Sequence, residues 1–287
     1  MITLSNRHSF QFMVASGALS FDGRGWPWEW PLRWCGLLDP SLFTIVTKTL
    51  TRLPRPGNLR WSHPWSVVKK IDGEGAINSI GLTNKGIDWW CQKVAPSIPA
   101  NYKIIASIEA KDRKELVEMI RLLEGKKILG LELNLSCPNS PSGRGSDTSH
   151  ILELCREAKK HSPYPLIAKL SFTHDYVRIA KELEGVVEAI AINSIPWKAI
   201  FGEKQSPLAR YGGGGVSGKV VQPFTWKMVD ELSKSTKIPV IGPSVWEYDD
   251  IQILFDKGAQ AIGFGSIFLS YPWRPTLYVK RWLKNKP

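Results

Sequence analysis

Short apolar segments alternate with longer segments of mixed polarity along most of the chain. The apolar segments are rich in valine, isoleucine and leucine and run for only a few residues, which is typical of buried strands. We expect eight strands of this kind: Phe12–Ala15, Leu42–Thr47, Lys103–Ile108, Gly130–Leu135, Leu166–Leu170, Glu188–Ile192, Pro239–Gly242 and Ala261–Gly265.

The segments between these strands have a helical pattern. The last of them is bounded clearly, since Asp249 is suited to cap its N-terminus and Gly258 follows its end. Nearly continuous apolar strands that alternate with helices favour a parallel sheet covered by helices. Eight such units, with no Gly-x-Gly-x-x-Gly motif after the first strand, predict an α/β fold of the closed (β/α)8 TIM-barrel type. The expected helices are Asp112–Leu123, His150–Lys160, Asp175–Leu183, Pro223–Ser233 and Asp249–Lys257.

Two segments interrupt this alternation. The tryptophan-rich segment Trp26–Trp34 is either packed beneath a loop or an exposed docking patch, and packing is the commoner outcome for such side chains. The region from Pro54 to Trp90 is too long for a plain loop, so we expect an excursion over the C-terminal mouth of the barrel. Because composition does not shift along the chain, we expect one domain over residues 1–287.

Composition narrows the class of protein. The net charge of +12 is spread thinly and no nucleic-acid-binding motif accompanies it, so a lysine-rich solvated surface without a nucleic-acid partner is expected. No apolar run reaches 18 residues and the first ten residues lack a signal-peptide pattern, so we expect a cytoplasmic protein without membrane insertion. The four cysteines lack metal-binding spacing, and no metal site is expected.

Polar residues follow several predicted strands at their C-terminal ends, which share one face in a barrel of this type. A lysine on an apolar strand is costly to bury unless a partner compensates it, although a lysine at a strand end can also extend to solvent. Two lysines together with several amides suit a flat ring or anion rich in carbonyl groups better than a metal. The residues concerned are Ser16, Gly17, Lys48, Asn134, Cys137, Asn139, Lys169, Asn193 and Ser194.

Glycine-rich segments follow the last strands. Gly242-Pro243-Ser244 ends the seventh strand and Gly263-Phe264-Gly265-Ser266 ends the eighth, while Gly212–Gly218 precedes the seventh helix. Backbone N–H groups after the last two strands of such barrels commonly hold a phosphate group. These segments therefore indicate a cofactor that carries a phosphate.

Taken in order, several motifs resemble those of one family. They are Phe12-Met13-Val14-Ala15-Ser16-Gly17, Thr47-Lys48-Thr49, Ile77-Asn78-Ser79-Ile80-Gly81-Leu82-Thr83-Asn84, Asn134-Leu135-Ser136-Cys137-Pro138-Asn139, Asn193-Ser194 and Gly215-Val216-Ser217-Gly218. The combination, which spans about Phe12 to Phe268, resembles the soluble class I branch of the dihydroorotate dehydrogenases, the branch with a catalytic cysteine.

This resemblance implies a barrel that holds FMN at its C-terminal mouth and oxidises dihydroorotate to orotate in pyrimidine biosynthesis. It implies that Cys137 is the base that removes the C5 proton, that hydride passes from C6 to flavin N5, and that Lys48 and Lys169 act beside the flavin and substrate. A homodimer is also possible by resemblance. The implied substrate-binding residues are Asn78, Asn134, Asn139, Asn193 and Ser194, and the implied cofactor-binding residues are Ala15, Ser16, Gly17, Lys48, Lys169, Gly218, Gly242, Ser244, Gly265 and Ser266.

The sequence departs from the family pattern at two places. Val14 stands where an asparagine is common, and Pro243-Ser244-Val245 replaces paired glycines with one residue fewer. Two alternatives therefore stay open: a related flavoenzyme that acts on another dihydropyrimidine, and a non-enzymatic barrel that binds flavin or phosphate. The terminal electron acceptor is open as well.

Overall fold

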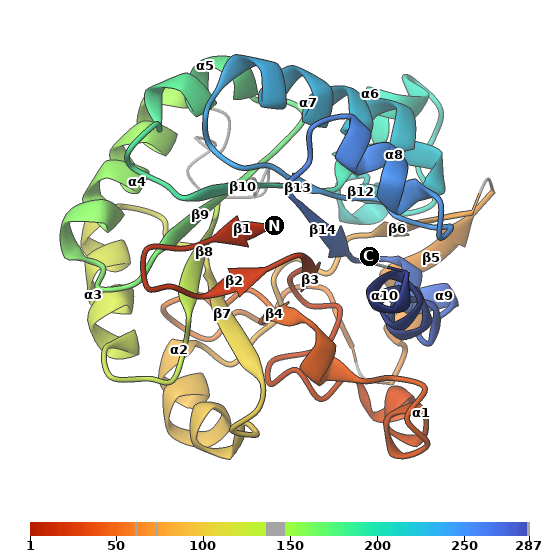
Figure 1. Cartoon of the computed structure of the whole chain (residues 1–287), viewed down its shortest axis with the longest axis horizontal. Helices are drawn as coiled ribbons and strands as arrows, with labels where there is room; N and C mark the ends of the chain where they lie inside the picture. The colour runs from red at the N-terminus through yellow and green to blue at the C-terminus, as the bar shows by residue number, and fades with distance from the viewer. Residues whose placement is uncertain (61, 73, 136–146, 286–287) are drawn as a thin grey trace.

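The protein is described from a computed structural model, which covers residues 1–60, 62–72, 74–135 and 147–285. Eight parallel strands form the central sheet in the order β10-β9-β8-β7-β4-β3-β14-β13. A parallel bridge between Ile190 and Val240 joins the two end strands, so the sheet closes into a barrel (Figure 1). The strands are β3 Phe12–Val14, β4 Thr44–Val46, β7 Lys103–Ile108, β8 Gly130–Asn134, β9 Leu166–Leu170, β10 Ala189–Ile192, β13 Ile241–Gly242 and β14 Ala261–Phe264.

All eight predicted strands are therefore confirmed: Lys103–Ile108 and Leu166–Leu170 match at both ends, and no end of the others differs by more than two residues. The main difference is at residues 40–42, where Pro40 starts a 3-10 turn and the strand begins only at Thr44. The predicted TIM-barrel class is confirmed as well.

Helices cover the outside of the barrel, and Figure 1 shows α3, α4, α5 and α7 following one another around one side of it. Asp112, Asp147 and Asp175 each cap a helix by accepting a hydrogen bond from a backbone N–H of its first turn. The apolar faces of these helices pack against the strands in one large core between the helices and the sheet. The helices of this outer layer are α3 Arg113–Leu123, α4 Thr148–His161, α5 Tyr176–Glu182, α7 Gln222–Ser235, α8 Asp250–Asp256, α9 Ile267–Ser270 and α10 Arg274–Lys284.

The remaining helices of the described residues are short, and the segment 87–94 packs into the same apolar core as the outer layer. They are α1 Trp30–Trp34, α2 Ile87–Trp89 with the π-helical turn Trp90–Val94, and α6 Trp197–Phe201, and 3-10 turns fall at Pro27–Glu29, Pro40–Leu42, Pro64–Ser66, Ala95–Ser97, Ala209–Tyr211 and Lys219–Val221.

One expectation about a helix end was wrong. Asp249 precedes α8, but its side chain makes no capping hydrogen bond. The next carboxylate, that of Asp250, instead accepts hydrogen bonds from the backbone N–H groups of Trp246 and Glu247 at 2.8 Å. Asp250 therefore stabilises the loop that precedes α8.

A small antiparallel hairpin closes the N-terminal end of the barrel. Its strands are β1 Ile2–Thr3 and β2 Ser9–Phe10, which lie across the barrel in Figure 1. Ile2, Leu4 and Phe10 pack against the inward residues of the barrel strands in a second apolar cluster. This end of the barrel is therefore filled by apolar side chains.

The predicted excursion is confirmed, and it is larger than expected. Strands β5 Val68–Ile71 and β6 Gly75–Asn78 pair with each other, and β6 also pairs with β12 Gly215–Gly218, which in turn pairs with β11 Ile195–Pro196. The glycine-rich segment before the seventh helix is thus part of this four-stranded sheet. The sheet has its own small apolar core around Ile77, Ile195 and Val216.

Candidate active site

A cavity of about 470 Å³ opens at the C-terminal end of the barrel, between the strand ends and the four-stranded sheet. The predicted site residues come from many strands, yet most of those that the structure describes line this one space. They are Ala15, Ser16, Gly17, Lys48, Asn78, Asn134, Lys169, Asn193, Ser194, Gly218, Ser244, Gly265 and Ser266.

Three predicted residues do not join this set. Cys137 and Asn139 lie outside the described residues. Gly242 is not among the residues that line the cavity; a Cβ atom at this position would lie 3.0 Å from Ala259 Cβ and from Leu254 Cδ2. Its small size therefore allows β13 to pack closely on α8, and a role of Gly242 toward a cofactor stays a prediction.

Lys48 follows β4 and lies almost completely buried in the cavity wall. Burial, and next the nearby charge of Lys169, lower the pKa of the Lys48 ammonium to about 8. Its Nζ atom lies 5.9 Å from the ring centre of Phe21. Lys48 therefore presents a poorly solvated positive charge, which favours a ligand that carries negative charge.

Lys169 has a partner that the sequence-based prediction missed. Its Nζ atom lies 3.5 Å from Oε1 of Glu132, a carboxylate whose side chain is 1% exposed. The same oxygen accepts a hydrogen bond from Ser107 Oγ at 2.9 Å. The predicted set of lysines and amides therefore lacked a carboxylate that belongs to the same site.

Glu132 was detectable from the alternation of β8. Residues two apart on a strand point to the same side of a sheet, so Glu132 shares a face with Asn134. In the sheet, Asn134 pairs in register with Lys169 on β9. The polar pair Glu132 and Asn134 thus faces the barrel interior directly beside the lysine.

A chain of hydroxyl groups links these charged residues to the carboxamides. Thr49 Oγ1 lies 2.9 Å from Ser107 Oγ and 3.0 Å from Ser16 Oγ, and it accepts a hydrogen bond from Asn134 Nδ2 at 3.3 Å. Ser16 Oγ also donates to the carbonyl of Thr47 at 2.9 Å. Thr49 therefore fixes groups from three strand ends in one arrangement, a role that the sequence did not indicate.

The opposite wall is made by the four-stranded sheet. Asn78 Nδ2 donates to the carbonyl of Gly215 at 3.4 Å, and a side chain at Gly215 would collide with Ser194 Oγ. Gly218 adopts a φ of +100°, and a Cβ there would lie 2.8 Å from the backbone oxygen of Glu74. Both glycines are required by the close approach of neighbouring groups.

The segment after β13 offers backbone donors to the cavity. Among the hydrogen bonds of the described residues, none has the N–H group of Ser244, Val245, Gly265 or Ser266 as its donor. All four residues line the cavity. Unpaired N–H groups gathered at one wall are suited to an anion, and phosphate is the usual one at this end of such barrels.

The tryptophan-rich segment lies at the mouth of the cavity and is packed in part, while a role as a docking patch stays a prediction. Trp26 and Trp28 line the cavity with stacked rings, 5.6 Å between centres, and Trp26 Nε1 donates to the carbonyl of Gly17 at 3.1 Å. Trp34, at the far end of the segment, is 72% exposed. The segment is therefore packed at its start and open to solvent at its end.

Other classes of site find no support in the described part of the chain. No group of three or more His, Cys, Asp or Glu side chains there is arranged to hold a metal ion. Within the same residues, no helix has the length and apolar character needed to cross a membrane.

Comparison with known proteins gives a consistent result. A family model described as "Dihydroorotate dehydrogenase" matches residues 33–269. The chain is 33% identical over 240 residues to the "Dihydroorotate dehydrogenase B (NAD(+)), catalytic subunit" of Caldicellulosiruptor saccharolyticus, which covers 80% of this chain and 78% of the relative. Proteins of the same description from Geobacillus kaustophilus (32% over 263 residues, 88% of this chain and 80% of the relative) and Thermoplasma volcanium (29% over 265 residues, 91% and 83%) are also similar.

Proposed function

Since the chain belongs to the dihydroorotate dehydrogenase family of flavin-dependent oxidoreductases, we propose that it oxidises dihydroorotate to orotate in pyrimidine biosynthesis with FMN as its cofactor. The observation that carries this proposal is the convergence of Lys48, Lys169 and the carboxamides of Asn78, Asn134 and Asn193 on one cavity. At the opposite end of the barrel, the N-terminal hairpin and the inward strand residues form an apolar cluster.

The cavity has the donors that FMN requires. Unpaired N–H groups at Ser244, Val245, Gly265 and Ser266 suit its phosphate. Lys169, held beside Glu132, suits the edge of the flavin ring where negative charge gathers on reduction. When bound, FMN supplies the acceptor for the hydride that leaves C6 of the substrate.

The remaining steps belong to the side chains of this chain. The carboxamides hold the pyrimidine ring and its carboxylate in place, and the Lys48 charge favours binding of this anion. Cys137, three residues after β8 in the sequence, is proposed as the base that accepts the C5 proton. Asn139 is proposed to contact the substrate as well.

The relatives' description as catalytic subunits supports a further part of the proposal. We infer that reducing equivalents leave this chain through a separate acceptor protein, because the relatives are described as the catalytic subunits of an enzyme. A homodimer stays a prediction.

The test is anaerobic reduction of the purified, flavin-loaded protein. We expect absorbance near the flavin maximum to bleach with dihydroorotate and to stay unchanged with dihydrouracil. Bleaching by dihydrouracil alone would favour a dihydropyrimidine enzyme of different specificity, and failure to take up any flavin would refute the cofactor.

Two variants test the assigned roles. Cys137→Ser should keep FMN but slow its reduction at neutral pH by about two orders of magnitude or more, because a hydroxyl is a far poorer base. Lys169→Ala should slow reduction as well. The matched control is Cys35→Ser, which alters an exposed thiol that does not line the cavity and should reduce at the wild-type rate.

A further inference from the structure

We propose that Gln222 and Asp250 are positioning residues that aim the backbone N–H groups of the loop 243–247 at the phosphate of the cofactor. This inference rests on the proposed function for the identity of the ligand. It concerns a part of the site where glycines are replaced by Pro243, Ser244 and Val245, so the usual flexible donors are missing.

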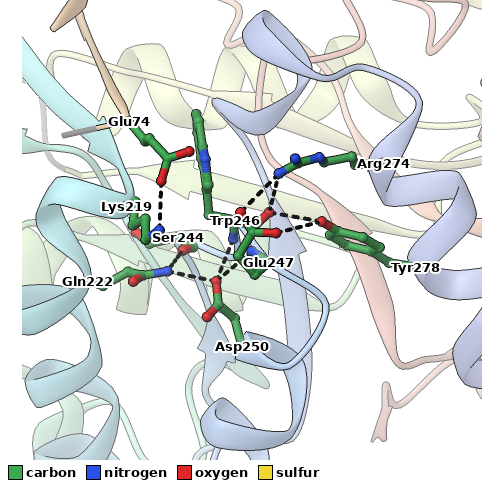
Figure 2. A network of polar contacts seen from close by, with 9 residues as sticks. All are labelled: Glu74, Lys219, Gln222, Ser244, Trp246, Glu247, Asp250, Arg274 and Tyr278. Atoms are coloured by element: carbon green, nitrogen blue, oxygen red, sulfur yellow. Dashed lines mark hydrogen bonds and ion pairs between the residues drawn. The ribbon is translucent and has the colours of Figure 1, made fainter. Parts of the chain in front are cut away.

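The loop is held from outside by two helices (Figure 2). Asp250 Oδ2 accepts hydrogen bonds from the N–H groups of Trp246 and Glu247 and from Gln222 Nε2, each at 2.8 Å. Gln222 Nε2 also donates to the carbonyl of Ser244 at 2.9 Å. One carboxylate and one carboxamide therefore bind both halves of the loop.

The direction of the free donors follows from these contacts. In a planar trans peptide the C=O group and the next N–H group point in opposite directions. The Ser244 carbonyl points to Gln222, and the Pro243 carbonyl accepts from Trp226 Nε1 at 3.2 Å. The N–H groups of Val245 and Ser244 therefore point away from α7, and both residues line the cavity.

Ser244 shows that this arrangement is imposed on the loop. Its φ of +65° is in the left-handed region, which residues with a side chain rarely adopt. Thr225 Oγ1 donates to Ser244 Oγ at 3.1 Å, which adds a contact on the side of α7. The surrounding contacts therefore hold Ser244 in a backbone conformation that a glycine at this position would adopt without such support.

The cations near the loop are already paired with carboxylates. Lys219 Nζ lies 2.7 Å from Glu74 Oε2, and Arg274 Nη1 lies 3.1 Å from Glu247 Oε1 (Figure 2). A phosphate would therefore depend mainly on the backbone donors. For this reason their orientation, and so Asp250 and Gln222, should control affinity for the phosphate in particular.

The test compares two flavins that differ only in the phosphate. The full chain, stripped of flavin, is titrated with FMN and with riboflavin, and binding is followed by quenching of flavin fluorescence. Asp250→Ala and Gln222→Ala should each weaken FMN binding about tenfold and leave riboflavin binding within twofold. Asp250→Asn keeps an oxygen acceptor and should restore most of the FMN affinity.

Asp256→Ala is the matched control, because Asp256 is an exposed aspartate at the other end of α8. Equal weakening of both flavins would overturn the inference, as would unchanged FMN affinity in Asp250→Ala and Gln222→Ala. If Asp250→Ala does not fold, the FMN-to-riboflavin ratio of Gln222→Ala decides in the same way. A wild-type chain that binds neither flavin would instead refute the proposed function.

Discussion

Lys169 on β9 and Glu132 on β8 form an ion pair inside the barrel, with 3.5 Å between Nζ and Oε1 and side chains only 10% and 1% exposed. Removing one partner of such a pair leaves the other charge buried without compensation, which typically costs about 3–5 kcal/mol. Glu132→Gln and Lys169→Met should therefore each lower the free energy of unfolding by about 3 kcal/mol.

A double-mutant cycle measures the interaction energy between Lys169 and Glu132 apart from the contacts that each makes with other residues. The double variant should lose less than the two single variants together, with a coupling energy of about 1–3 kcal/mol, measured by urea denaturation of the flavin-free protein. The exposed pair Lys234–Asp230 on α7 is the control, and its cycle should give less than about 0.5 kcal/mol. Additive losses at Lys169 and Glu132 would show that the two charges do not stabilise each other.

The alternation of inward residues explains both the success and the gap of sequence-based prediction. Along β7 the inward face passes from Ile105 to Ser107, and along β9 it passes from Ile167 to Lys169. The apolar inward residues at the start of each strand make these segments recognisable as strands and so predict the barrel. The polar inward residues near the end of each strand were recognised only where they were lysines or amides, so Glu132 was overlooked.

Other features could not be predicted because they depend on contacts between distant residues. Gly215–Gly218 becomes a strand only by pairing with Gly75–Asn78, about 140 residues earlier in the chain. Asp250, and not Asp249, accepts the hydrogen bonds of the Trp246 and Glu247 N–H groups, because the loop folds back over the later residue. Local propensity favours either aspartate equally.

The lowered pKa of Lys48 predicts a stability that rises with pH. Burial, and next the charge of Lys169, bring this pKa to about 8, whereas the unfolded chain keeps the ordinary lysine pKa of 10.5. Below pH 8 both states carry the proton, and the folded state bears the full cost of the buried charge. Between about pH 8 and 10.5 the unfolded state binds more protons, so the free energy of unfolding rises with pH.

Lys48→Met should remove this dependence. Because each pKa unit corresponds to about 1.4 kcal/mol, the flavin-free variant should be more stable than wild type by about 3 kcal/mol at pH 7, and by much less near pH 10. Urea denaturation at both pH values measures the difference. The control Lys114→Met alters an exposed lysine of α3 and should show no such change. A gain for Lys48→Met that is the same at pH 7 and pH 10 would contradict the assignment.

Thr49 is expected to support both stability and substrate binding. Thr49→Val keeps the shape but removes the hydroxyl group that contacts Ser16, Ser107 and Asn134, which should cost about 1–3 kcal/mol. Because Asn134 is then less well fixed, KM for dihydroorotate should rise several-fold while the flavin stays bound. Thr3→Val removes a hydroxyl contact at the exposed hairpin and should change neither quantity. An unchanged KM in Thr49→Val would limit the role of this residue to folding.

Gly218 combines a backbone conformation that favours glycine with a close approach of neighbouring backbone atoms, and both should destabilise a variant with a side chain there. Gly218→Ala forces a side chain onto a φ of +100° and brings its Cβ within 2.8 Å of the Glu74 backbone oxygen. Gly185→Ala also has a positive φ, of +77°, but meets nothing within 4 Å, so it measures the cost of a positive φ without a collision, about 1–2 kcal/mol, whereas the ψ of −161° at Gly218 adds a conformational cost of its own. Gly218→Ala should be destabilised by at least about 1 kcal/mol more, since backbone atoms of β6 and of the preceding turn must move. Because Gly218 itself lines the cavity, FMN should also dissociate faster from this variant and at the wild-type rate from Gly185→Ala. Equal destabilisation and equal FMN release in the two variants would mean that the turn before β6 yields freely, and that Gly218 is required only for its backbone conformation.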